Sequence, residues 1–397
     1  MEGTLTLKEV KRYETCQAVL EGRITVEGAA KGLQISERQI YRIKARVAAQ
    51  GPEGVIHGNK GQEPHNKTPS EVRERAIELA QTEYAQFNFS HLAESLAEEH
   101  GIELSAETLR RWMRPMGHGG PLRRHKKHRK RRKRKEREGE MLFLDGSPHH
   151  WFGEDEPECC LILASDDATG KPLYGKFQPT EDRDGCFEVC YRVFQKYGFP
   201  GCFYLDRASQ FITTRHGGLH VTQSDSDDTQ FQRAMAECVV QLIFANSPQA
   251  RGRAERLNGS FQGRLVAELT HKGIKDCKEA TRYLNRVFIP KYSRRFGKPP
   301  QNPVPAWRAV PTGLDLKSVL SAKYSRVVDR DNTVRFGGSV YQLYPSKDSS
   351  SIARKKIEVQ ERFDGTIQFH HPKHGRIRAK QIFSKEQDNA LAAPSLF

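Results

Sequence analysis

The sequence predicts a multidomain α+β protein, with helical modules at the N-terminus, an α/β core in the middle and a small β-barrel at the C-terminus. Apolar residues recur at helical spacing as far as residue 113. Short apolar strands then alternate with helical patterns over residues 139–300, and a period of two follows residue 320. A chain of 397 residues also exceeds one ordinary domain, so two to four domains are expected.

The composition indicates globular domains with a polar surface and a polyanionic partner. Hydrophobic residues make up 36% of the chain, charged residues make up 29%, and the formal net charge is +16. No apolar run approaches the ~18 residues that a membrane span needs, and the N-terminus lacks the apolar core of a signal peptide. The eight cysteines form no CxxC pair, which argues against a zinc finger. We therefore expect a cytoplasmic protein with reduced thiols and no membrane partner.

Residues 1–60 carry the pattern of a helix-turn-helix. A helical stripe over residues 7–21 precedes a capping-box pattern at residues 36–39. The helix that starts there points Ile40 and Val47 inward and basic side chains outward, as a helix in the major groove of DNA would. A small helical bundle with a solvated basic face is the alternative. The predicted DNA contacts of this module are Arg38, Arg42 and Arg46.

Residues 61–120 carry a second pattern of the same kind. Thr68 and Ser105 are placed to cap helices, and Phe89 opens another helical run that Gly101 closes. This indicates a second helix-turn-helix, of the winged-helix or homeodomain-like kind. Two successive modules indicate a long and specific DNA site. The basic residues of this module that are predicted to contact DNA are Arg110, Arg111 and Arg114.

Residues 121–138 form a basic linker. Between Arg123 and Arg137 there are 12 Lys and Arg residues and one Glu. Each cation that meets a DNA phosphate releases a counterion, so the linker is expected to bind the DNA backbone without sequence preference. A solubilising or targeting charge run is the alternative. The predicted backbone contacts are Lys126, Lys127, Arg129, Lys130, Arg131 and Arg132.

Residues 139–300 are predicted to form an α/β core in the order β-β-β-α-β-α-β-α. The first three strands read as an antiparallel meander, and the polar, Gly-rich residues 207–228 read as an insertion. The first strand is expected to end at Asp145, with residues 146–148 turning the chain. The last helix of this order is expected to run unbroken to about Thr270. The predicted strands are 141–145, 158–165, 172–177, 201–206 and 239–244, and further predicted helices are 184–197, 231–238 and 276–290.

Three acids of this region are placed where they can converge. Asp145 and Asp206 end the first and fourth strands, and Glu255 lies in the first turns of the helix that follows the fifth. Three converging carboxylates can hold two Mg²⁺ or Mn²⁺ ions at one phosphate. Taken singly, an Asp at a strand end is usually a turn residue, and a Glu at a helix start usually interacts with the helix dipole.

Other ligand types in the core are assigned structural roles. Asp166 and Asp167 are assigned to a tight turn, and Cys186 and Cys190, one helical turn apart, to the core. The remaining candidates are acceptable ligands by type, but their flanks indicate loops; they are His149, His150, Asp225, Asp227 and Asp228.

At residues 139–300 the chain resembles the DDE transposases of bacterial insertion sequences, which have a retroviral-integrase-like catalytic core. Four segments carry the resemblance: residues 144–147, 166–170, 204–211 and 245–261. The interval of 49 residues from Asp206 to Glu255 is longer than is common in the family, and the insertion accounts for the excess. Arg207 is a second departure, because that position is usually a small or amide residue.

The resemblance implies a ribonuclease-H-like core in which Asp145, Asp206 and Glu255 bind two Mg²⁺ or Mn²⁺ ions. It implies cleavage that frees a 3′-OH at the terminal inverted repeats of the element, followed by strand transfer into target DNA. A homodimer or larger assembly on double-stranded DNA, and association with the bacterial nucleoid, are expected with it. Residues near Glu255 that could contact DNA are Arg251, Arg253, Arg256, Asn258 and Gln262.

Residues 301–386 are predicted to form a linker and a small β-barrel, and residues 387–397 a tail. Short runs with a period of two, and the hairpin signal Asp364-Gly365, indicate the barrel. Two alternatives to a transposase stay open. One is a DNA-binding regulator with an inactive integrase-like core, and the other is a host nuclease that cuts DNA without joining it.

Overall fold

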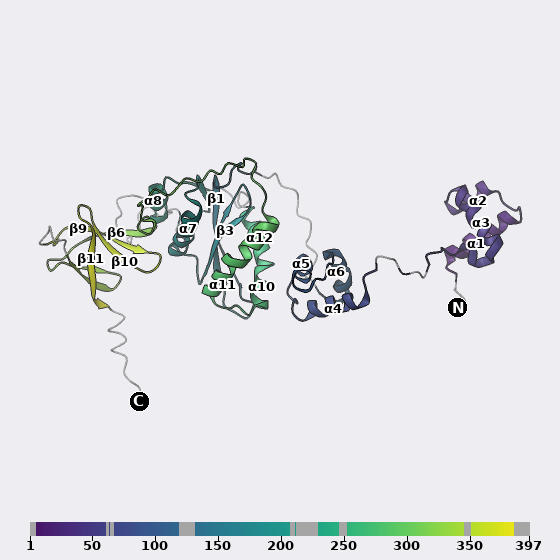
Figure 1. Cartoon of the computed structure of the whole chain (residues 1–397), viewed down its shortest axis with the longest axis horizontal. Helices are drawn as coiled ribbons and strands as arrows, with labels where there is room; N and C mark the ends of the chain where they lie inside the picture. Colours follow the sequence, from purple (N-terminus) through teal and green to yellow (C-terminus); the bar gives the residue numbers. More distant parts are fainter. Residues whose placement is uncertain are drawn as a thin grey trace, which may run out of the picture. The chain divides into compact units, whose positions relative to one another are not determined.

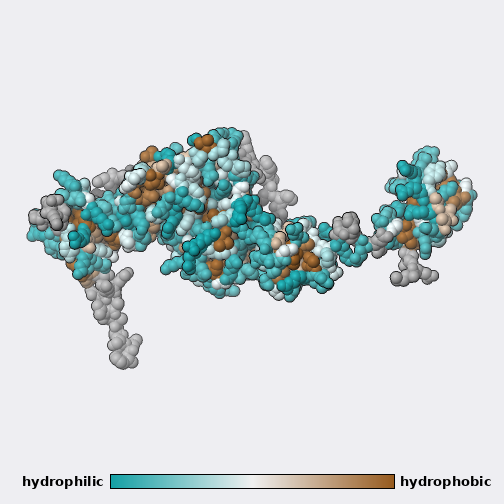
Figure 2. All heavy atoms as spheres, viewed as in Figure 1, coloured by the Kyte–Doolittle hydropathy of each residue, from teal (hydrophilic) through white to brown (hydrophobic). Residues whose placement is uncertain are grey.

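The computed structural model divides the chain into two compact units, Met1–Arg75 and Ala76–Phe397 (Figure 1). The residues that the structure describes are 5–60, 63, 67–118, 132–206, 211, 229–245, 252–344 and 351–384. Figure 2 shows hydrophilic residues over most of the visible surface, with smaller hydrophobic patches between them. Within the described part of the chain, no helix is both long and apolar enough to cross a membrane.

The first unit is helical, as its sequence predicts. It contains α1 (Leu7–Leu20), α2 (Val26–Leu33), α3 (Glu37–Gln50) and the 3-10 turn η1 (Gly51–Val55). The predicted capping box is confirmed, because Ser36 accepts a hydrogen bond from the Gln39 amide while Gln39 accepts one from the Ser36 amide. Ile40 and Val47 are buried, as predicted.

The outward orientation predicted for the basic residues of α3 holds for Arg38 and Arg42 but not for Arg46. Arg46 is half-buried, and its Nη1 lies 3.5 Å from the carbonyl oxygen of Ile56. The cause is η1, which folds back over the end of α3. Gly54 approaches so closely that a Cβ there would lie 2.5 Å from the Arg46 carbonyl. No pattern in the sequence predicted this contact between η1 and α3.

A second helical module follows, made of α4 (Ser70–Gln81), α5 (Phe89–His100), α6 (Ala106–Met113) and the 3-10 turn η2 (Arg114–Met116). Asn88 and Ser105 cap α5 and α6, and Gly101 ends α5 in the left-handed conformation. Leu92, Leu96 and Leu109 form its core. Of the predicted DNA contacts, Arg111 and Arg114 are exposed, and Arg110 is half-buried and ion-paired with Glu107.

The central sheet has the predicted five strands. Its order is β3-β2-β1-β4-β5; the first three strands pair antiparallel, and β4 and β5 run parallel to β1. This mixed arrangement puts β1 at the centre of the sheet, between an antiparallel and a parallel neighbour. The strands are β1 (Met141–His149), β2 (Cys159–Asp166), β3 (Pro172–Gln178), β4 (Cys202–Leu205) and β5 (Gln241–Phe244).

The prediction that the first strand ends at Asp145 is wrong. The strand continues through Pro148 to His149, and it pairs with β2 over that whole length. Its parallel pairing with β4 extends only to Phe143. Beyond that residue, the edge of β1 that faces away from β2 is not paired with β4. A proline is tolerated on such an edge because it has no amide hydrogen to leave unsatisfied. Asp145 therefore lies inside a strand rather than at its end.

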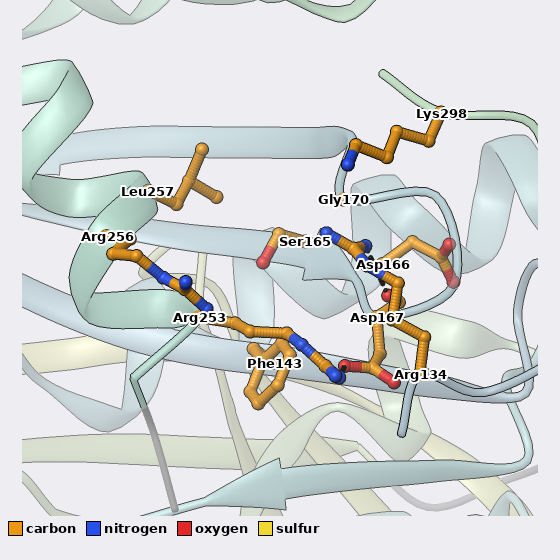
Figure 3. Close-up of a pocket in the computed structure, with 10 residues that line it drawn as sticks. All are labelled: Arg134, Phe143, Ser165, Asp166, Asp167, Gly170, Arg253, Arg256, Leu257 and Lys298. Carbon is orange, nitrogen blue, oxygen red and sulfur yellow. Dashed lines mark hydrogen bonds and ion pairs between the residues drawn. The ribbon is translucent and has the colours of Figure 1, made fainter. Parts of the chain in front are cut away.

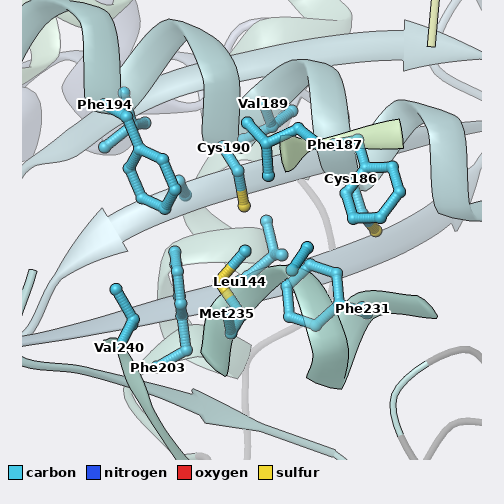
Figure 4. Packing of buried hydrophobic residues seen from close by; sticks show 14 of the residues in the cluster. Leu144, Cys186, Phe187, Val189, Cys190, Phe194, Phe203, Phe231, Met235 and Val240 are labelled. Carbon is cyan, nitrogen blue, oxygen red and sulfur yellow. The ribbon is translucent and has the colours of Figure 1, made fainter. Parts of the chain in front are cut away.

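Alternate residues of β2 face two hydrophobic clusters, one on each side of the sheet. Ile162 and Ala164 pack with α7 (Arg183–Tyr197) and α8 (Gln230–Glu237), and Figure 4 shows side chains of this cluster. Leu161 and Leu163 pack with the helices of the other face. Of the predicted insertion, only Phe211 lies within the described residues. It is buried, with its ring 4.9 Å from that of Phe231.

The long helix predicted after the fifth strand is broken into two, α9 (Ala254–Gln262) and α10 (Leu265–His271). The next segment consists of α11 (Cys277–Tyr283), the π-helical turn η4 (Leu284–Phe288) and α12 (Ile289–Phe296). Val287, three residues after the buried Leu284, is 45% exposed, whereas Phe288 is buried. A π turn carries an extra residue, and this shifts the buried stripe by one position.

The C-terminal region has α13 (Leu316–Val319) and six antiparallel strands in the order β6-β9-β10-β11-β8-β7. In the described residues these form one sheet with β6 and β7 at its edges, around a core that includes Val359 and Phe369. The predicted hairpin at Asp364-Gly365 is confirmed. The strands are β6 (Ser321–Val327), β7 (Thr333–Phe336), β8 (Ser339–Tyr344), β9 (Lys356–Arg362), β10 (Ile367–His371) and β11 (Gly375–Ser384).

Candidate active site

The register of the central sheet aligns the two predicted aspartates. Strands β1 and β4 run parallel, with Phe143 opposite Tyr204. Two residues further along each strand direction stand Asp145 and Asp206, both half-buried. Parallel neighbours end at the same edge of a sheet, so equivalent positions on them lie side by side. The two strands are neighbours in the sheet, as convergence of their aspartates requires.

Helix α9 is attached to β1 next to Asp145. Asn258 Nδ2 donates to Asp145 Oδ2 at 2.8 Å, and one helical turn later Gln262 Nε2 donates to Ser147 Oγ at 3.3 Å. Asn258 is buried, and its side-chain amide donates this hydrogen bond inside the protein. Glu255 precedes Asn258 by three residues and Gln262 by seven, which puts it on the same helical face. It is exposed, in the first turn of α9.

The described residues do not gather the three acids into a metal-binding group. No cluster of three or more His, Cys, Asp or Glu side chains close enough to hold a metal ion is found in this part of the chain. Carboxylates at ligand distance from one another repel unless a cation lies between them. The structure thus brings Asp145 and Asp206 to matching positions and connects Asp145 to α9, whereas Glu255 projects from the start of that helix.

The other candidate ligands are engaged elsewhere or lie outside the described residues. Cys186 and Cys190 are buried in the core, where burial raises the pKa of both thiols well above the ordinary value. His149 packs edge-on against Trp151 at 5.3 Å, and His150 Nδ1 lies 2.9 Å from the carbonyl oxygen of Glu156. Asp225, Asp227 and Asp228 lie outside the described residues.

A role of Asp167 beyond the predicted turn was missed. Asp167 is fully buried, and its Oδ1 accepts from Arg132 Nη2 at 2.7 Å and also from Arg253. Its Oδ2 accepts from the backbone amide of Lys135 at 2.8 Å. One carboxylate therefore connects the end of the basic linker to the start of α9. Two adjacent acids between a fully apolar strand and the turn were the only signal of this role in the sequence.

Asp166, the neighbouring acid, shapes the turn itself. It is buried, and it accepts from the Gly139 amide at 3.0 Å and from both the amide and the hydroxyl of Thr169 at 2.7 Å. Burial raises the pKa of its carboxyl above the ordinary value, although these hydrogen bonds oppose the shift. The two adjacent acids thus have different roles: Asp166 stabilises the turn, and Asp167 binds the side chains of basic residues.

The predicted DNA contacts near the core have different surroundings. Arg132 and Arg253 are ion-paired with Asp167, and Arg256 is exposed, with Nε donating to the carbonyl oxygen of Gly252 at 2.7 Å. The others lie outside the described residues: Lys126, Lys127, Arg129, Lys130, Arg131 and Arg251.

Buried polar contacts connect the second helical module to the helices that follow α9, which the sequence did not indicate. His91 Nε2 lies 2.9 Å from Glu268 Oε1, and the Tyr283 hydroxyl donates to Glu268 Oε2 at 2.5 Å. Arg264 donates to both oxygens of the buried Glu94, at 2.6 and 2.9 Å. Burial alone would raise the pKa of Glu268, but the hydrogen bonds from His91 and Tyr283 outweigh it, and the pKa is lowered.

Comparisons with known proteins identify the N-terminal region first. A family model described as a homeodomain-like domain matches residues 39–113, from the start of α3 to the end of α6. This agrees with the helix-turn-helix character predicted for both modules.

The whole chain has relatives among transposases. It is 30% identical over 389 residues to "Putative transposase y4bF" of Sinorhizobium fredii, a match that covers 97% of this chain and 83% of the relative. It is also 29% identical over 397 residues to the transposase for insertion sequence IS1202 of Streptococcus pneumoniae, covering 91% of this chain and 84% of that protein. The chain belongs to the family of insertion-sequence transposases.

Solved structures that this transposase matches include retroviral integrases. The catalytic core domain of HTLV-2 integrase in complex with magnesium, in its trimeric form, has 14% identity and a TM-score of 0.28, and the match covers 37% of this chain and 82% of that one. The simian T-cell lymphotropic virus intasome in complex with the PP2A regulatory subunit B56 gamma has 13% identity and a TM-score of 0.32, covering 66% and 85%. Likenesses at these TM-scores define no shared fold.

Proposed function

We propose that this transposase binds the terminal inverted repeats of its insertion sequence, cleaves the DNA at their ends and joins them to target DNA. The observation that carries this proposal is the alignment of Asp145 and Asp206 on neighbouring parallel strands, with α9 held to Asp145 by Asn258. Membership of the transposase family gives these acids a reaction to perform.

The catalytic residues of this proposal are Asp145, Asp206 and Glu255. All three offer carboxylate oxygens, the ligands that Mg²⁺ and Mn²⁺ prefer, and Glu255 lies on the face of α9 that already contacts β1. Two such ions, when bound, activate the attacking oxygen and stabilise the leaving oxygen at one phosphate. The protein's part is to hold the three carboxylates in place and to orient the DNA strand.

The core topology supports a ribonuclease-H-like fold. An antiparallel meander continues into parallel strands in the order β3-β2-β1-β4-β5, with helices packed on both faces. We extend the proposal to the C-terminal strands, whose six-stranded antiparallel sheet around one apolar core suits a small barrel. Its exposed basic residues suit contact with DNA or with a sister subunit.

The partners follow from the reaction. The homeodomain-like region and the basic linker give the protein two ways to hold double-stranded DNA, one specific and one electrostatic. Joining two element ends requires two active sites close together, so we propose a homodimer or a larger assembly on DNA.

A strand-transfer assay with the element's own ends tests the proposal. The variants Asp145→Asn, Asp206→Asn and Glu255→Gln should each abolish Mg²⁺-dependent cleavage and joining and leave end binding intact. Glu154→Gln is the matched control, because Glu154 is an exposed acid in the loop after β1. Full activity in all three acid variants would contradict the site assignment.

The same assay separates the two alternatives. A regulator with an inactive core would bind the ends and show no cleavage even as the wild-type protein. A host nuclease would cut any duplex and join none.

A further inference from the structure

A basic cavity lies between the turn after β2 and the start of α9, and the proposed reaction does not account for it. Its volume is about 290 Å³. Figure 3 shows the residues that line it, and they come from five separate segments of the chain. Four of them are cationic: Arg134, Arg253, Arg256 and Lys298.

The cationic side chains of the cavity exceed the carboxylates that could neutralise them. Asp167 is shared between Arg253 and Arg132. Among the described residues, Arg256 and Lys298 form no ion pair. Burial and the nearby charge of Arg253 lower the pKa of the Arg134 guanidinium, which is the response of a cation crowded by other cations. A site with surplus positive charge and exposed guanidinium groups is complementary to an anion.

The cavity is held in shape by its own hydrogen bonds. Arg134 Nη1 donates to the carbonyl oxygens of Asp167 at 2.8 Å and Ala168 at 3.3 Å. The carboxylate of Asp167 accepts a hydrogen bond from Arg253. The backbone amide of Lys298 donates to the carbonyl oxygen of Thr169 at 2.9 Å. The guanidinium groups of Arg134 and Arg253, and the backbone of Lys298, are therefore positioned before any ligand arrives, which reduces the entropy lost on binding.

The cavity opens on the face of the sheet that carries Asp145. Phe143 lines it, and Asp145 follows two residues later on the same side of β1. Arg253 and Arg256 come from the first turns of α9, on either side of Glu255 in the chain. A phosphate held here would lie beside the proposed catalytic acids and separate from them.

We propose that this cavity binds one backbone phosphate of the DNA strand next to the phosphate that is cleaved. One arginine guanidinium can donate two parallel hydrogen bonds to a phosphate, and the Lys298 ammonium adds a further positive charge. The inference rests on the proposed function, because it assigns the cavity to the same DNA strand. Its role is to position the strand; no bond forms or breaks there.

Inorganic phosphate is the first probe, because it tests the cavity without any cleavage. The melting temperature of the full-length protein is measured in phosphate and in chloride at equal ionic strength. Saturating phosphate should raise the wild-type melting temperature by about 2–4 °C. Lys298→Glu and the double variant Arg134→Gln/Lys298→Gln should lose that rise. Lys298→Glu serves as the safer variant, because the Lys298 side chain has no ion-pair partner among the described residues that the substitution would remove.

The matched control is Arg282→Gln/Lys278→Gln on α11, which removes the same charge from residues that do not line the cavity. It should keep the phosphate response of the wild type. An unchanged melting temperature in phosphate for the wild type, or an equal rise in the cavity variants, would overturn the proposal.

A short duplex without the element's ends distinguishes DNA phosphate from free phosphate. Its affinity is measured against salt concentration for the wild type, the cavity variant and the control. Loss of one or two phosphate contacts should lower the salt dependence of the cavity variant by about 1–2 on a log–log plot and leave the control unchanged. Equal slopes in the cavity variant and the wild type would exclude DNA as the ligand.

The two cavity experiments test the phosphate site separately from the catalytic assignment. Asp145→Asn and Glu255→Gln should keep both the phosphate response and the salt dependence. If the cavity shows no phosphate response while the acid variants are inactive, only the cavity proposal is overturned. If the cavity binds phosphate while the acid variants stay active, only the catalytic assignment is overturned.

Discussion

The side-chain amide of Asn258 donates a hydrogen bond to the carboxylate of Asp145, with 2.8 Å between Nδ2 and Oδ2. These residues are separated by 113 positions in the chain, and the bond joins α9 to the central strand of the sheet. Together with the contact of Gln262 with Ser147, it holds one face of α9 against β1, and Glu255 lies on that face.

Asn258→Ala should lower strand transfer by about 10–100-fold without weakening end binding, because the ligand carboxylate loses the partner that orients it. The Mg²⁺ concentration for half-maximal activity should rise, which general destabilisation would not cause. Strand transfer measured across a Mg²⁺ series checks this, with melting temperature as the folding control. Equal Mg²⁺ dependence in variant and wild type would remove Asn258 from the site.

Chelation of divalent ions should stop cleavage and joining and leave binding to the element's ends unchanged. The reason is that the proposed ligands are carboxylates, whereas the helical modules contain no predicted metal site. Parallel gel-shift and cleavage assays in EDTA, followed by restoration with Mg²⁺ or Mn²⁺, provide the measurement. Cleavage that persists in EDTA would contradict the proposed chemistry.

Asp167→Asn should destabilise the core by at least about 2 kcal/mol, because it leaves Arg132 and Arg253 without their shared buried partner. Breaking a buried pair costs about 3–5 kcal/mol, and the partial exposure of both arginines reduces that figure. The urea midpoint of unfolding is the readout. Asp155→Asn, at an exposed loop acid, is the control and should unfold like the wild type.

The contact of His91 with Glu268 should make the docking of the second helical module sensitive to acid. The pKa of Glu268 is lowered in the folded protein, so its contribution is complete above the ordinary value of 4.5 and is lost as pH falls through the lower folded value. Limited proteolysis between α6 and the core, followed from pH 6 downward, should show the loss. Glu268→Gln should flatten this pH dependence, and a wild-type profile in that variant would contradict the assignment.

Ser36→Ala should destabilise the first unit by about 1 kcal/mol, because the N-cap hydrogen bond of α3 is lost. Ser36→Thr should retain most of the stability, since threonine also caps helices. Thermal unfolding of the full-length protein, followed at the transition of this unit, compares the two variants. No difference between them would mean that the cap contributes nothing to α3.

Local signals in the sequence predicted most elements of the fold. The caps at Ser36 and Ser105, and the fully apolar strand at residues 159–166, depend only on residues a few positions apart, and the structure has all of them. Two features differed from the local patterns. The first strand continued past Asp145 because β2 pairs with it to His149. Val287 turned outward because a π turn shifted the helical register.

For the candidate site, the sequence by itself predicted Asp145, Asp206 and Glu255 as candidate ligands and the order of the elements that carry them, because strand and helix patterns place such residues at predictable points of an α/β core. Only the tertiary structure decided what holds them. The bond between Asn258 and Asp145 joins residues 113 positions apart, and the contact of His91 with Glu268 joins residues 177 apart. Asp167 lies 86 positions from Arg253 and 35 from Arg132. Such pairings depend on how the chain packs in three dimensions, and no local period or spacing encodes them.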